Sequence, residues 1–243
     1  MSRSETLYDA IIVAAGNGNR FGGTIPKQYY QLNGMAVIRH SVQAFQAHPL
    51  IGRVILVIHK DHQNYITNLF SAVEMAELTI VTGADTRSQS VLNGLKALGD
   101  APPKSVLIHD GARPLVTATL ITDICTALQS ASAVIPVTEI TDTIKTVRHK
   151  QTVTTLDRND LRAVQTPTGF SYSKLIELIG NNTDPELTEE SCLFEQAGIK
   201  VQYIAGDNRN IKITRPEDLL IAASLQTQQK DSPDENAPHR LWL

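Results

Sequence analysis

The stretch that decides the fold is Ala10-Ile-Ile-Val-Ala-Ala-Gly-Asn-Gly-Asn-Arg-Phe-Gly-Gly-Thr-Ile-Pro-Lys27. Its first part, Ala10 to Ala15, is an apolar run of the kind that forms a fully buried strand. Glycines follow at once, and glycine lets backbone N–H groups approach an anion closely. Arg20 and Lys27 add two positive charges to the same loop. A buried strand with a glycine-rich, cationic loop predicts a phosphate-binding turn.

Similar apolar runs recur further along the chain, about every 25 residues, as βαβ units require. They are Val54 to Ile58, Leu78 to Val81, Val106 to Ile108 and Ala133 to Val137. Amphipathic helices are expected between them, for example where Ile38, Val42 and Phe45 share one face. The alternation predicts an α/β fold, with a single doubly wound, mostly parallel sheet of Rossmann-like type.

Two familiar phosphate loops do not match the stretch after the first strand. A dinucleotide fingerprint needs Gly-x-Gly-x-x-Gly, but after Gly16 and Gly18 the next glycine, Gly22, comes one place late. A P-loop needs a lysine after its second glycine, and Thr24 stands there after Gly23. A nicotinamide dehydrogenase and a P-loop ATPase are therefore both disfavoured.

The composition excludes several classes of protein. The 243 residues include 22 Lys and Arg and 25 Asp and Glu, a net charge of −3, which argues against a nucleic-acid-binding protein. No apolar stretch reaches the length of a membrane helix and the start is polar, so no membrane association and a cytoplasmic location are expected. The two cysteines, Cys125 and Cys192, fall in expected helices and form no metal or redox motif.

The regular pattern breaks between Glu139 and Arg158. Alternating β-branched residues on both sides of a polar turn at residues 148–151 predict a long β-hairpin that protrudes as an arm. Because an isolated ribbon is marginally stable in water, we expect it to pack on a second copy of the chain, giving a homodimer. The alternative is an edge hairpin folded onto its own sheet. Asp142-Thr143, Arg158 and Gln165-Thr166-Pro167 are expected to cluster around this hairpin.

The rest of the chain predicts further helices, a strand and a tail. Helices are expected at residues 171–180 and 188–197, then a strand at 200–204 and a last helix from Pro216, with Thr214 as its cap. Helical periodicity ends after Gln226. We therefore expect one domain over residues 1–227, its arm at about 139–160, and a polar, disordered tail or linker over 228–243.

Asp110 is the candidate ligand for a divalent cation. It follows the strand at 106–108 in His109-Asp-Gly-Ala-Arg113-Pro114, at the strand ends where open parallel sheets bind ligands. Mg²⁺ takes one or two carboxylates and completes its shell with water and phosphate oxygens. His109 is interpreted as structural, and His59 with His62 as solvated, because no histidine pair has a convincing zinc spacing.

Together these segments resemble the 2-C-methyl-D-erythritol 4-phosphate cytidylyltransferases of the non-mevalonate isoprenoid pathway. The resemblance runs from about Asp9 to Ser224. Its motifs are Ala14-Ala-Gly-x-Gly with Arg20, Pro26-Lys-Gln-Tyr29, Asp110-Gly-Ala-Arg-Pro114, Asp142-Thr-x-Lys145, Asp157-Arg158, Gln165-Thr-Pro167 and Asn210-Ile-Lys-x-Thr-x-Pro-Glu-Asp218.

The resemblance implies a nucleotidyltransferase fold and attack of the substrate phosphate on the α-phosphorus of CTP, with pyrophosphate leaving and no covalent enzyme intermediate. It also implies roles for particular residues. Arg20 and Lys27 would stabilise the triphosphate charge, Arg158 and Lys212 would position the sugar-alcohol phosphate, and Asp110 would bind Mg²⁺. The remaining substrate-binding residues implied are Ala14, Ala15, Gly16, Ala84, Asp85 and Ser90 for cytidine, and Arg113, Thr143, Thr166 and Thr188 for the acceptor. A swapped arm would bring Arg158 to the neighbour's site.

Three departures from the family pattern concern the rim and the acceptor pocket. Gly111 stands where the family usually has alanine, Glu189 where it has aspartate after Thr188, and Thr168-Gly169 replaces a commoner Gln-containing pair. Three alternatives stay open: a ribitol-5-phosphate cytidylyltransferase, a NAD-dependent dehydrogenase, and a nucleotide-binding module without catalysis. Some relatives continue into a cyclodiphosphate synthase domain, to which the tail from Lys230 would be a linker.

Overall fold

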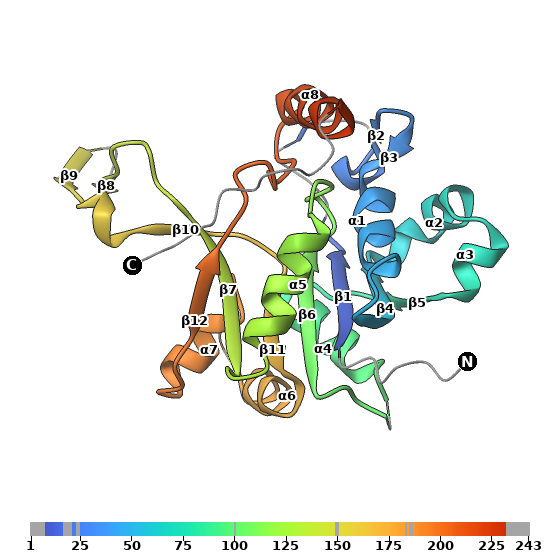
Figure 1. Cartoon of the computed structure of the whole chain (residues 1–243), viewed down its shortest axis with the longest axis horizontal. Coiled ribbons are helices and arrows are strands. Elements are labelled where there is room, and N and C mark those ends of the chain that lie inside the picture. Colours follow the sequence, from blue (N-terminus) through green and yellow to red (C-terminus); the bar gives the residue numbers. More distant parts are fainter. Residues whose placement is uncertain are drawn as a thin grey trace.

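A mixed eight-stranded sheet forms the centre of the chain (Figure 1). The computed structural model describes residues 8–16, 21–22, 25–99, 101–148, 151–182, 184 and 187–231. The strands of the sheet are β1 (Tyr8–Ala14), β4 (Ile51–Ile58), β5 (Leu78–Thr82), β6 (Ser105–Asp110), β7 (Ala133–Glu139), β10 (Arg162–Val164), β11 (Thr168–Ser171) and β12 (Gln202–Ala205). Every apolar run expected to be a strand is therefore confirmed, with bounds that differ by a few residues.

The parallel half of the sheet has the order β6-β1-β4-β5. Strands β1, β4 and β6 are buried on both faces, and side chains alternate between them: Ala10 and Ile12 belong to one core and Ile11 to the other. This alternation follows from the two-residue period of a strand. The carboxyl ends of all four strands meet at one edge, which is where the sequence places its candidate site.

The other half of the sheet is antiparallel in part. β11 pairs antiparallel with β6 and β7, β10 pairs antiparallel with β7, and β12 pairs parallel with β7 on its other side. The sequence analysis predicts neither β10 nor β11. It places Gln165 to Pro167 beside the hairpin, which is wrong, because this segment connects β10 to β11 inside the sheet.

Helices cover both faces, as expected for a doubly wound fold (Figure 1). On one face pack α1 (Val37–Gln46) and α5 (Ala118–Ala127), with Ile66 of the short α2 (Gln63–Leu69) joining the same core. On the other pack α4 (Arg87–Lys96), α6 (Tyr172–Gly180) and α7 (Ser191–Gln196). The remaining small elements on the first face are η2 (Lys60–His62) and α3 (Ala72–Ala76).

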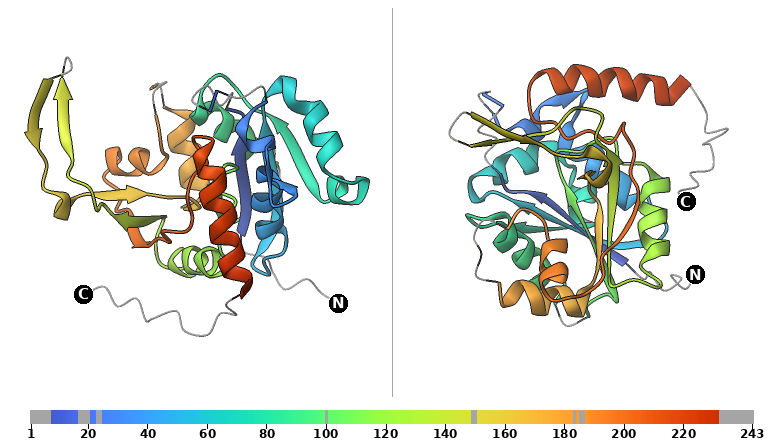
Figure 2. Two further views of the ribbon diagram at one scale, coloured as in Figure 1. Left: turned by 90° about the horizontal axis from the view of Figure 1, so that it is seen from above. Right: turned by 90° about the vertical axis from the view of Figure 1, so that its left-hand side faces the viewer.

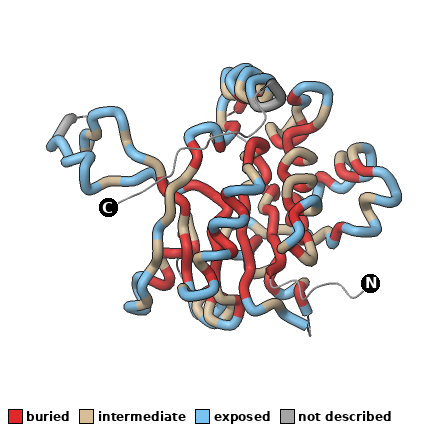
Figure 3. Tube along the Cα trace, in the orientation of Figure 1, coloured by how far each residue is buried: buried red, intermediate tan, exposed pale blue. Residues whose placement is uncertain are grey.

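The expected hairpin is confirmed as an arm of two strands, β8 (Lys145–Arg148) and β9 (Gln151–Thr155), followed by η3 (Arg158–Asp160). The two strands pair with each other in a separate sheet and stand away from the domain in Figure 1 and in the left view of Figure 2. Figure 3 shows the arm exposed where the central strands are buried. Val147 is 60% exposed and Val153 57%. The alternative, a hairpin paired to its own sheet, is wrong for this chain.

Helix α8 (Glu217–Asp231) closes a third, small core above the sheet. Ala222 packs there with Phe21, Leu32 and Leu115, next to η1 (Lys27–Tyr29) and the ribbon of β2 (Gln31–Leu32) and β3 (Met35–Ala36). The helix continues to Asp231, so an end at Gln226 is wrong. Residues 227–231 are polar and lose the apolar period, yet they have good helix propensity. The rest of the expected tail, 232–243, lies outside the described residues.

Neither membrane helices nor disulfides occur in the part of the chain that the structure describes. No helix there is both long and apolar enough to cross a bilayer. Cys125 is buried in α5, Cys192 lies in α7, and both are free thiols, as expected.

Candidate active site

A cleft of about 540 Å³ opens where β1, β4, β5 and β6 end. The loops after these strands form its walls, and the segment before α8 closes one side. Its lining residues are Val13, Ala14, Ala15, Gly16, Lys27, Gln28, His59, Lys60, Gly83, Ala84, Asp85, Thr86, Arg87, Ser90, Asp110, Ala112, Lys212 and Thr214. The site therefore lies at the strand ends where the sequence analysis expects it.

Gln28 holds the loop that follows β1. Its side chain is buried, and Nε2 donates to the carbonyl oxygens of Ala14, at 2.9 Å, and Gly16, at 3.2 Å. The preceding residue, Lys27, begins η1 and lines the cleft. Gln28 thus fixes the backbone at the start of the glycine loop, and its neighbour Lys27 places a positive charge beside that loop. Arg20, the other cation expected here, lies outside the described residues.

The loop after β5 approaches the loop after β1 very closely at Gly83. A Cβ atom on Gly83 would lie 2.4 Å from the Ala15 Cβ and 2.9 Å from the Ser90 Oγ, so only glycine fits. Ser90 fixes the turn that follows, since its hydroxyl accepts from the Ala84 N–H at 2.9 Å and donates to the Thr86 carbonyl at 2.9 Å. The expected cytidine residues are thereby brought together as two facing stretches of backbone.

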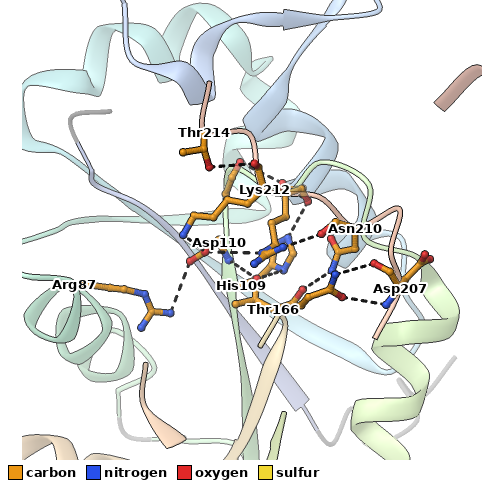
Figure 4. A network of polar contacts seen from close by, with 12 residues as sticks. Arg87, His109, Asp110, Thr166, Asp207, Asn210, Lys212 and Thr214 are labelled. Atoms are coloured by element: carbon orange, nitrogen blue, oxygen red, sulfur yellow. Dashed lines mark hydrogen bonds and ion pairs between the residues drawn. The ribbon is translucent and has the colours of Figure 1, made fainter. Parts of the chain in front are cut away.

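Asp110, the last residue of β6, carries the main negative charge of the cleft. Lys212 Nζ lies 2.6 Å from its Oδ2, and Arg87 Nη2 lies 3.7 Å from its Oδ1 (Figure 4). Burial would raise the pKa of the Asp110 carboxyl, but Arg87 and Lys212 outweigh burial and hold this pKa well below its ordinary value. Asp110 is therefore ionised at neutral pH.

A buried polar network behind the cleft fixes the position of Asp110. The Asp110 N–H donates to Thr166 Oγ1 at 3.0 Å, and this hydroxyl also lies 3.1 Å from His109 Nδ1. His109 Nε2 lies 3.1 Å from the carbonyl oxygen of Arg113, which can only accept, so Nε2 carries the proton. Burial lowers the pKa of His109 to about 4. His109 is therefore neutral and structural, as expected.

The same network anchors the segment that carries Lys212. Asn210 Nδ2 donates to the Thr166 carbonyl at 2.7 Å, and Arg113 Nη1 donates to the Asn210 carbonyl at 2.8 Å (Figure 4). The Ile213 N–H donates to the Ala112 carbonyl at 2.8 Å. Lys212 thus lies between two anchored residues, which keeps its ammonium group against Asp110.

Several expected site residues do not line the cleft. Thr166 and Arg113 lie behind it and hold Asp110 and Asn210, and Thr188 is exposed just before α7. Thr143 and Arg158 are exposed at the base of the arm, where Arg158 Nη1 donates to the Thr141 carbonyl. The structure therefore brings the nucleotide residues together within one chain, whereas the arm residues stay apart from them.

Sequence reasoning missed several residues of the cleft, among them two cations, Lys60 and Arg87. Arg87 is the first residue of α4. Thr86, just before it, caps the helix by accepting from the Gln89 N–H. Because the segment was interpreted only as a helix cap, Arg87 was not recognised as a site residue. His59 and Lys60 follow β4 and line the cleft, but the polar residues around them were interpreted as a solvated helix start. Gln28 was part of a quoted motif without a role.

The interpretation of His59 and His62 as a solvated pair is wrong. His59 lines the cleft, and His62 is buried with its ring edge-on to Tyr29 at a centroid distance of 5.3 Å. Alternating polar residues around the pair suggested an exposed helix start, but Tyr29 and Tyr65 fold over His62.

The residues present fit a divalent cation only in part. No group of three metal-ligating side chains exists among the residues that the structure describes. Asp110 is ionised and reaches the cleft, so it fits a cation that takes one carboxylate and completes its shell with phosphate oxygens and water, as Mg²⁺ does.

Comparison with known proteins identifies the family. A sequence profile described as IspD, 2-C-methyl-D-erythritol 4-phosphate cytidylyltransferase, matches residues 8–228. The chain belongs to this family. It is 36% identical over 227 residues to the 2-C-methyl-D-erythritol 4-phosphate cytidylyltransferase of Bacillus mycoides, which covers 92% of this chain and 100% of that protein.

Other cytidylyltransferase relatives agree with this membership. The chain is 39% identical over 224 residues to the bifunctional enzyme IspD/IspF of Desulfotalea psychrophila, which covers 91% of this chain but 57% of that protein. The chain thus spans a little over half of that relative. The structure of 4-diphosphocytidyl-2C-methyl-D-erythritol synthase from Anaerococcus prevotii matches with a TM-score of 0.77 and 30% identity, over 91% of this chain and 98% of that one.

Membership in the cytidylyltransferase family confirms two expectations from the sequence, the family itself and its α/β fold. Both the matching profile and the Bacillus mycoides relative carry the name 2-C-methyl-D-erythritol 4-phosphate cytidylyltransferase. The alternative of a NAD-dependent dehydrogenase is therefore excluded.

Proposed function

We propose that this chain transfers a cytidylyl group from CTP to 2-C-methyl-D-erythritol 4-phosphate, giving 4-diphosphocytidyl-2-C-methyl-D-erythritol and pyrophosphate. The observation that carries the proposal is the cleft itself, where Arg87 and Lys212 flank the carboxylate of Asp110 and Lys27 lines the wall beside the glycine loop. The proposed substrates follow from the family of the chain. Both are anionic, and the cleft carries positively charged side chains that can bind them.

The chemistry requires alignment and charge neutralisation. An oxygen of the acceptor phosphate forms a bond to the α-phosphorus of CTP, and the bond from that phosphorus to the β-bridging oxygen breaks. Pyrophosphate leaves with the electron pair, and no protein nucleophile takes part. Such transfers are accelerated mainly by fixed positive groups near the developing charge. Lys27, with Arg20, suits the triphosphate, and Lys212 suits the acceptor phosphate.

We infer that the two facing backbone stretches hold the nucleoside. Ala14 to Gly16 and Gly83 to Asp85 both line the cleft, and the absence of a side chain on Gly83 lets the two stretches approach closely. Backbone groups can read the edge of a base at fixed positions, and Gln28 and Ser90 keep those positions.

A bound Mg²⁺ would supply positive charge that offsets the negative charge of the triphosphate. Asp110 is the described residue placed to hold it. Lys212 Nζ lies 2.6 Å from one Asp110 oxygen, so this lysine would share the carboxylate with the cation.

We further infer that the chain acts as a homodimer joined through the arm. Arg158 and Thr143 lie at the arm base and do not line the cleft of their own chain. The exposed Val147 and Val153 give the arm an apolar surface suited to a second copy. A swapped arm would deliver Arg158 to the neighbour's acceptor site.

The deciding experiment measures pyrophosphate release with CTP, UTP and ATP, each paired with 2-C-methyl-D-erythritol 4-phosphate and with ribitol 5-phosphate, with and without Mg²⁺. We expect release with CTP, the methylerythritol phosphate and Mg²⁺ together. A higher kcat/KM with ribitol 5-phosphate would replace the proposed acceptor by its sister substrate.

Substitution of Lys27 separates an enzyme from a binding module. If Lys27 stabilises the transition state, Lys27→Ala lowers kcat by about 10²-fold to 10³-fold. Lys104→Ala, an exposed lysine at the opposite end of β6, should leave kcat unchanged. Nucleotide binding without any turnover in the wild type would instead support the module.

A further inference from the structure

The strongest unexplained feature near the cleft is the buried carboxylate of Glu190. Its side chain is fully buried at the start of α7, and one of its oxygens forms an ion pair with Arg87 Nη1. Arg87 Nη2, the other terminal nitrogen of the same guanidinium, lies 3.7 Å from Asp110 Oδ1. Arg87 therefore connects a residue outside the cleft with the carboxylate inside it, and Figure 4 shows the guanidinium pointing toward Asp110.

This arrangement is costly if it serves stability alone. A buried carboxylate loses its hydration, and ion pairing in the interior often fails to recover that loss. Glu190 Oε2 is moreover buried with no hydrogen-bond partner among the described residues. An apolar side chain would fill the same space at lower cost. The cost points to a requirement for the charge at this position.

The balance of charges around Asp110 shows what Glu190 changes. Three cations, Arg87, Arg113 and Lys212, lie within 4.0 Å of the Asp110 carboxylate. Glu190 holds Arg87 Nη1 away from Asp110 and offsets part of the positive charge of Arg87. The nearby Glu189 carboxylate accepts from the Ser191 N–H at 2.9 Å, and it attracts Arg87 without forming one of the described ion pairs. Without Glu190, Asp110 would be the only direct carboxylate partner of Arg87 in the described structure.

We propose that Glu190 is a positioning residue for cytidylyl transfer, which fixes Arg87 so that this guanidinium lines the cleft without closing onto Asp110. Glu190 acts through Arg87 and does not touch substrate. The inference rests on the proposed function, because it assigns Asp110 and Arg87 to the working cleft of the cytidylyltransferase.

The test compares two substitutions at Glu190 whose effects on charge and packing are opposite. Glu190→Gln keeps the size of the side chain and an acceptor for Arg87 but removes the charge. Glu190→Asp keeps the charge but removes a methylene and leaves a small void. Glu195→Gln, at an exposed carboxylate on the same helix, is the matched control. Steady-state kinetics with CTP and thermal unfolding are measured for each.

We expect Glu190→Gln to lower kcat by about tenfold to 100-fold, as positional errors in active sites do. The KM for CTP and the melting temperature should stay near those of the wild type. Glu190→Asp should retain more of the kcat while melting at a lower temperature, and Glu195→Gln should match the wild type throughout.

Three results would overturn the inference: a kcat for Glu190→Gln equal to that of Glu195→Gln, a lower kcat for Glu190→Asp than for Glu190→Gln, or loss of cooperative unfolding in Glu190→Gln. The last two would assign Glu190 to packing and stability. Failure of the proposed function is distinguishable, because the wild type itself would then release no pyrophosphate from CTP and the methylerythritol phosphate.

Discussion

Gly83 is the cleft glycine at which an added side chain would make the shortest steric contact. A Cβ atom there would lie 2.4 Å from the Ala15 Cβ, so Gly83→Ala must push the loop after β5 away from the loop after β1. Because these loops form the proposed nucleoside site, we expect the affinity for CTP to fall by at least about tenfold. Calorimetric titration of CTP measures this loss.

Gly180→Ala is the matched control for this substitution. A Cβ atom at Gly180, the last residue of α6, meets nothing within 4 Å, and alanine favours helix over glycine. This variant should bind CTP as the wild type does and unfold at an equal or higher temperature. Unchanged CTP binding in Gly83→Ala would show that the loops are not the nucleoside site.

His109 makes the stability of the domain depend on pH. Its pKa is lowered by burial to about 4 in the folded state, against 6.5 for the free side chain. The unfolded chain therefore binds a proton that the folded chain does not between these values, so stability is full above pH 6.5 and falls as the pH drops toward 4. The loss is on the order of 3 kcal/mol in the free energy of unfolding.

Denaturant unfolding at several pH values tests this dependence on His109. In His109→Gln the amide can still donate toward the Arg113 carbonyl and accept from Thr166, but it does not titrate. We expect a flatter decline between pH 6.5 and 4, with a residual slope from His48 and His62, whose pKa values burial also lowers. An identical slope in both proteins would contradict the assignment.

The sequence located about half of the residues that line the cleft but not how they are held. Ala14, Lys27, Asp110 and Lys212 were found because each follows a recognisable strand or motif. Thr166 was expected to contact substrate, whereas its hydroxyl is hydrogen-bonded to the Asp110 N–H. A motif identifies a residue near a site, but only the fold shows which of its atoms are already used.

At the scale of elements, the arm is separable from the domain. The Leu156 N–H donates to the Ile144 carbonyl at 3.0 Å, so the chain ends are adjacent where β8 begins and β9 ends. Replacing residues 145–155 by an Asn-Gly turn should therefore leave a folded domain. We expect this variant to be a monomer with little activity, as measured by light scattering and pyrophosphate release.

A milder change distinguishes loss of the dimer from loss of the arm. Val147→Lys with Val153→Lys keeps the hairpin but charges its apolar surface, and it should shift the wild-type dimer toward monomer. If either variant were a fully active monomer, the shared acceptor site would be refuted. If the wild type were itself a monomer, the dimer would be refuted.

Prediction of elements succeeded where one physical signal dominated. Strands β1, β4, β6 and β7 are apolar runs buried on both faces, and such runs are visible in the sequence. β10 and β11 are short, interrupted at Thr166-Pro167, and include Arg162 and Gly169. Their place in the sheet depends on pairing with the distant β7 and β6, and no local pattern encodes that pairing.

At the scale of the whole molecule, the net charge of −3 conceals a positive cleft. Among its described lining residues, Lys27, Lys60, Arg87 and Lys212 outnumber the two carboxylates. Attraction of CTP to such a cleft is screened by salt. We expect the KM for CTP to rise several-fold between about 0.05 M and 0.5 M NaCl, where the Debye length falls from about 14 Å to 4 Å.

Lys60 offers a graded check of this salt effect. Lys60→Gln removes one exposed charge from the cleft and should reduce the rise of KM with salt, whereas Lys104→Gln, at the other end of the sheet, should not. A KM independent of salt in the wild type would mean that the cleft cations contribute by contact alone.

The anchoring of Lys212 determines when the cleft is completed as the chain emerges from the ribosome. Its walls begin at Val13 and end at Thr214, and Lys212 is fixed by Asn210 and by the Ile213 to Ala112 bond. A nascent chain that has completed all eight strands of the central sheet, the last of which ends at Ala205, still lacks the lysine that faces Asp110. The cleft is therefore completed only when residues 212–214, which follow the last strand, have been synthesised.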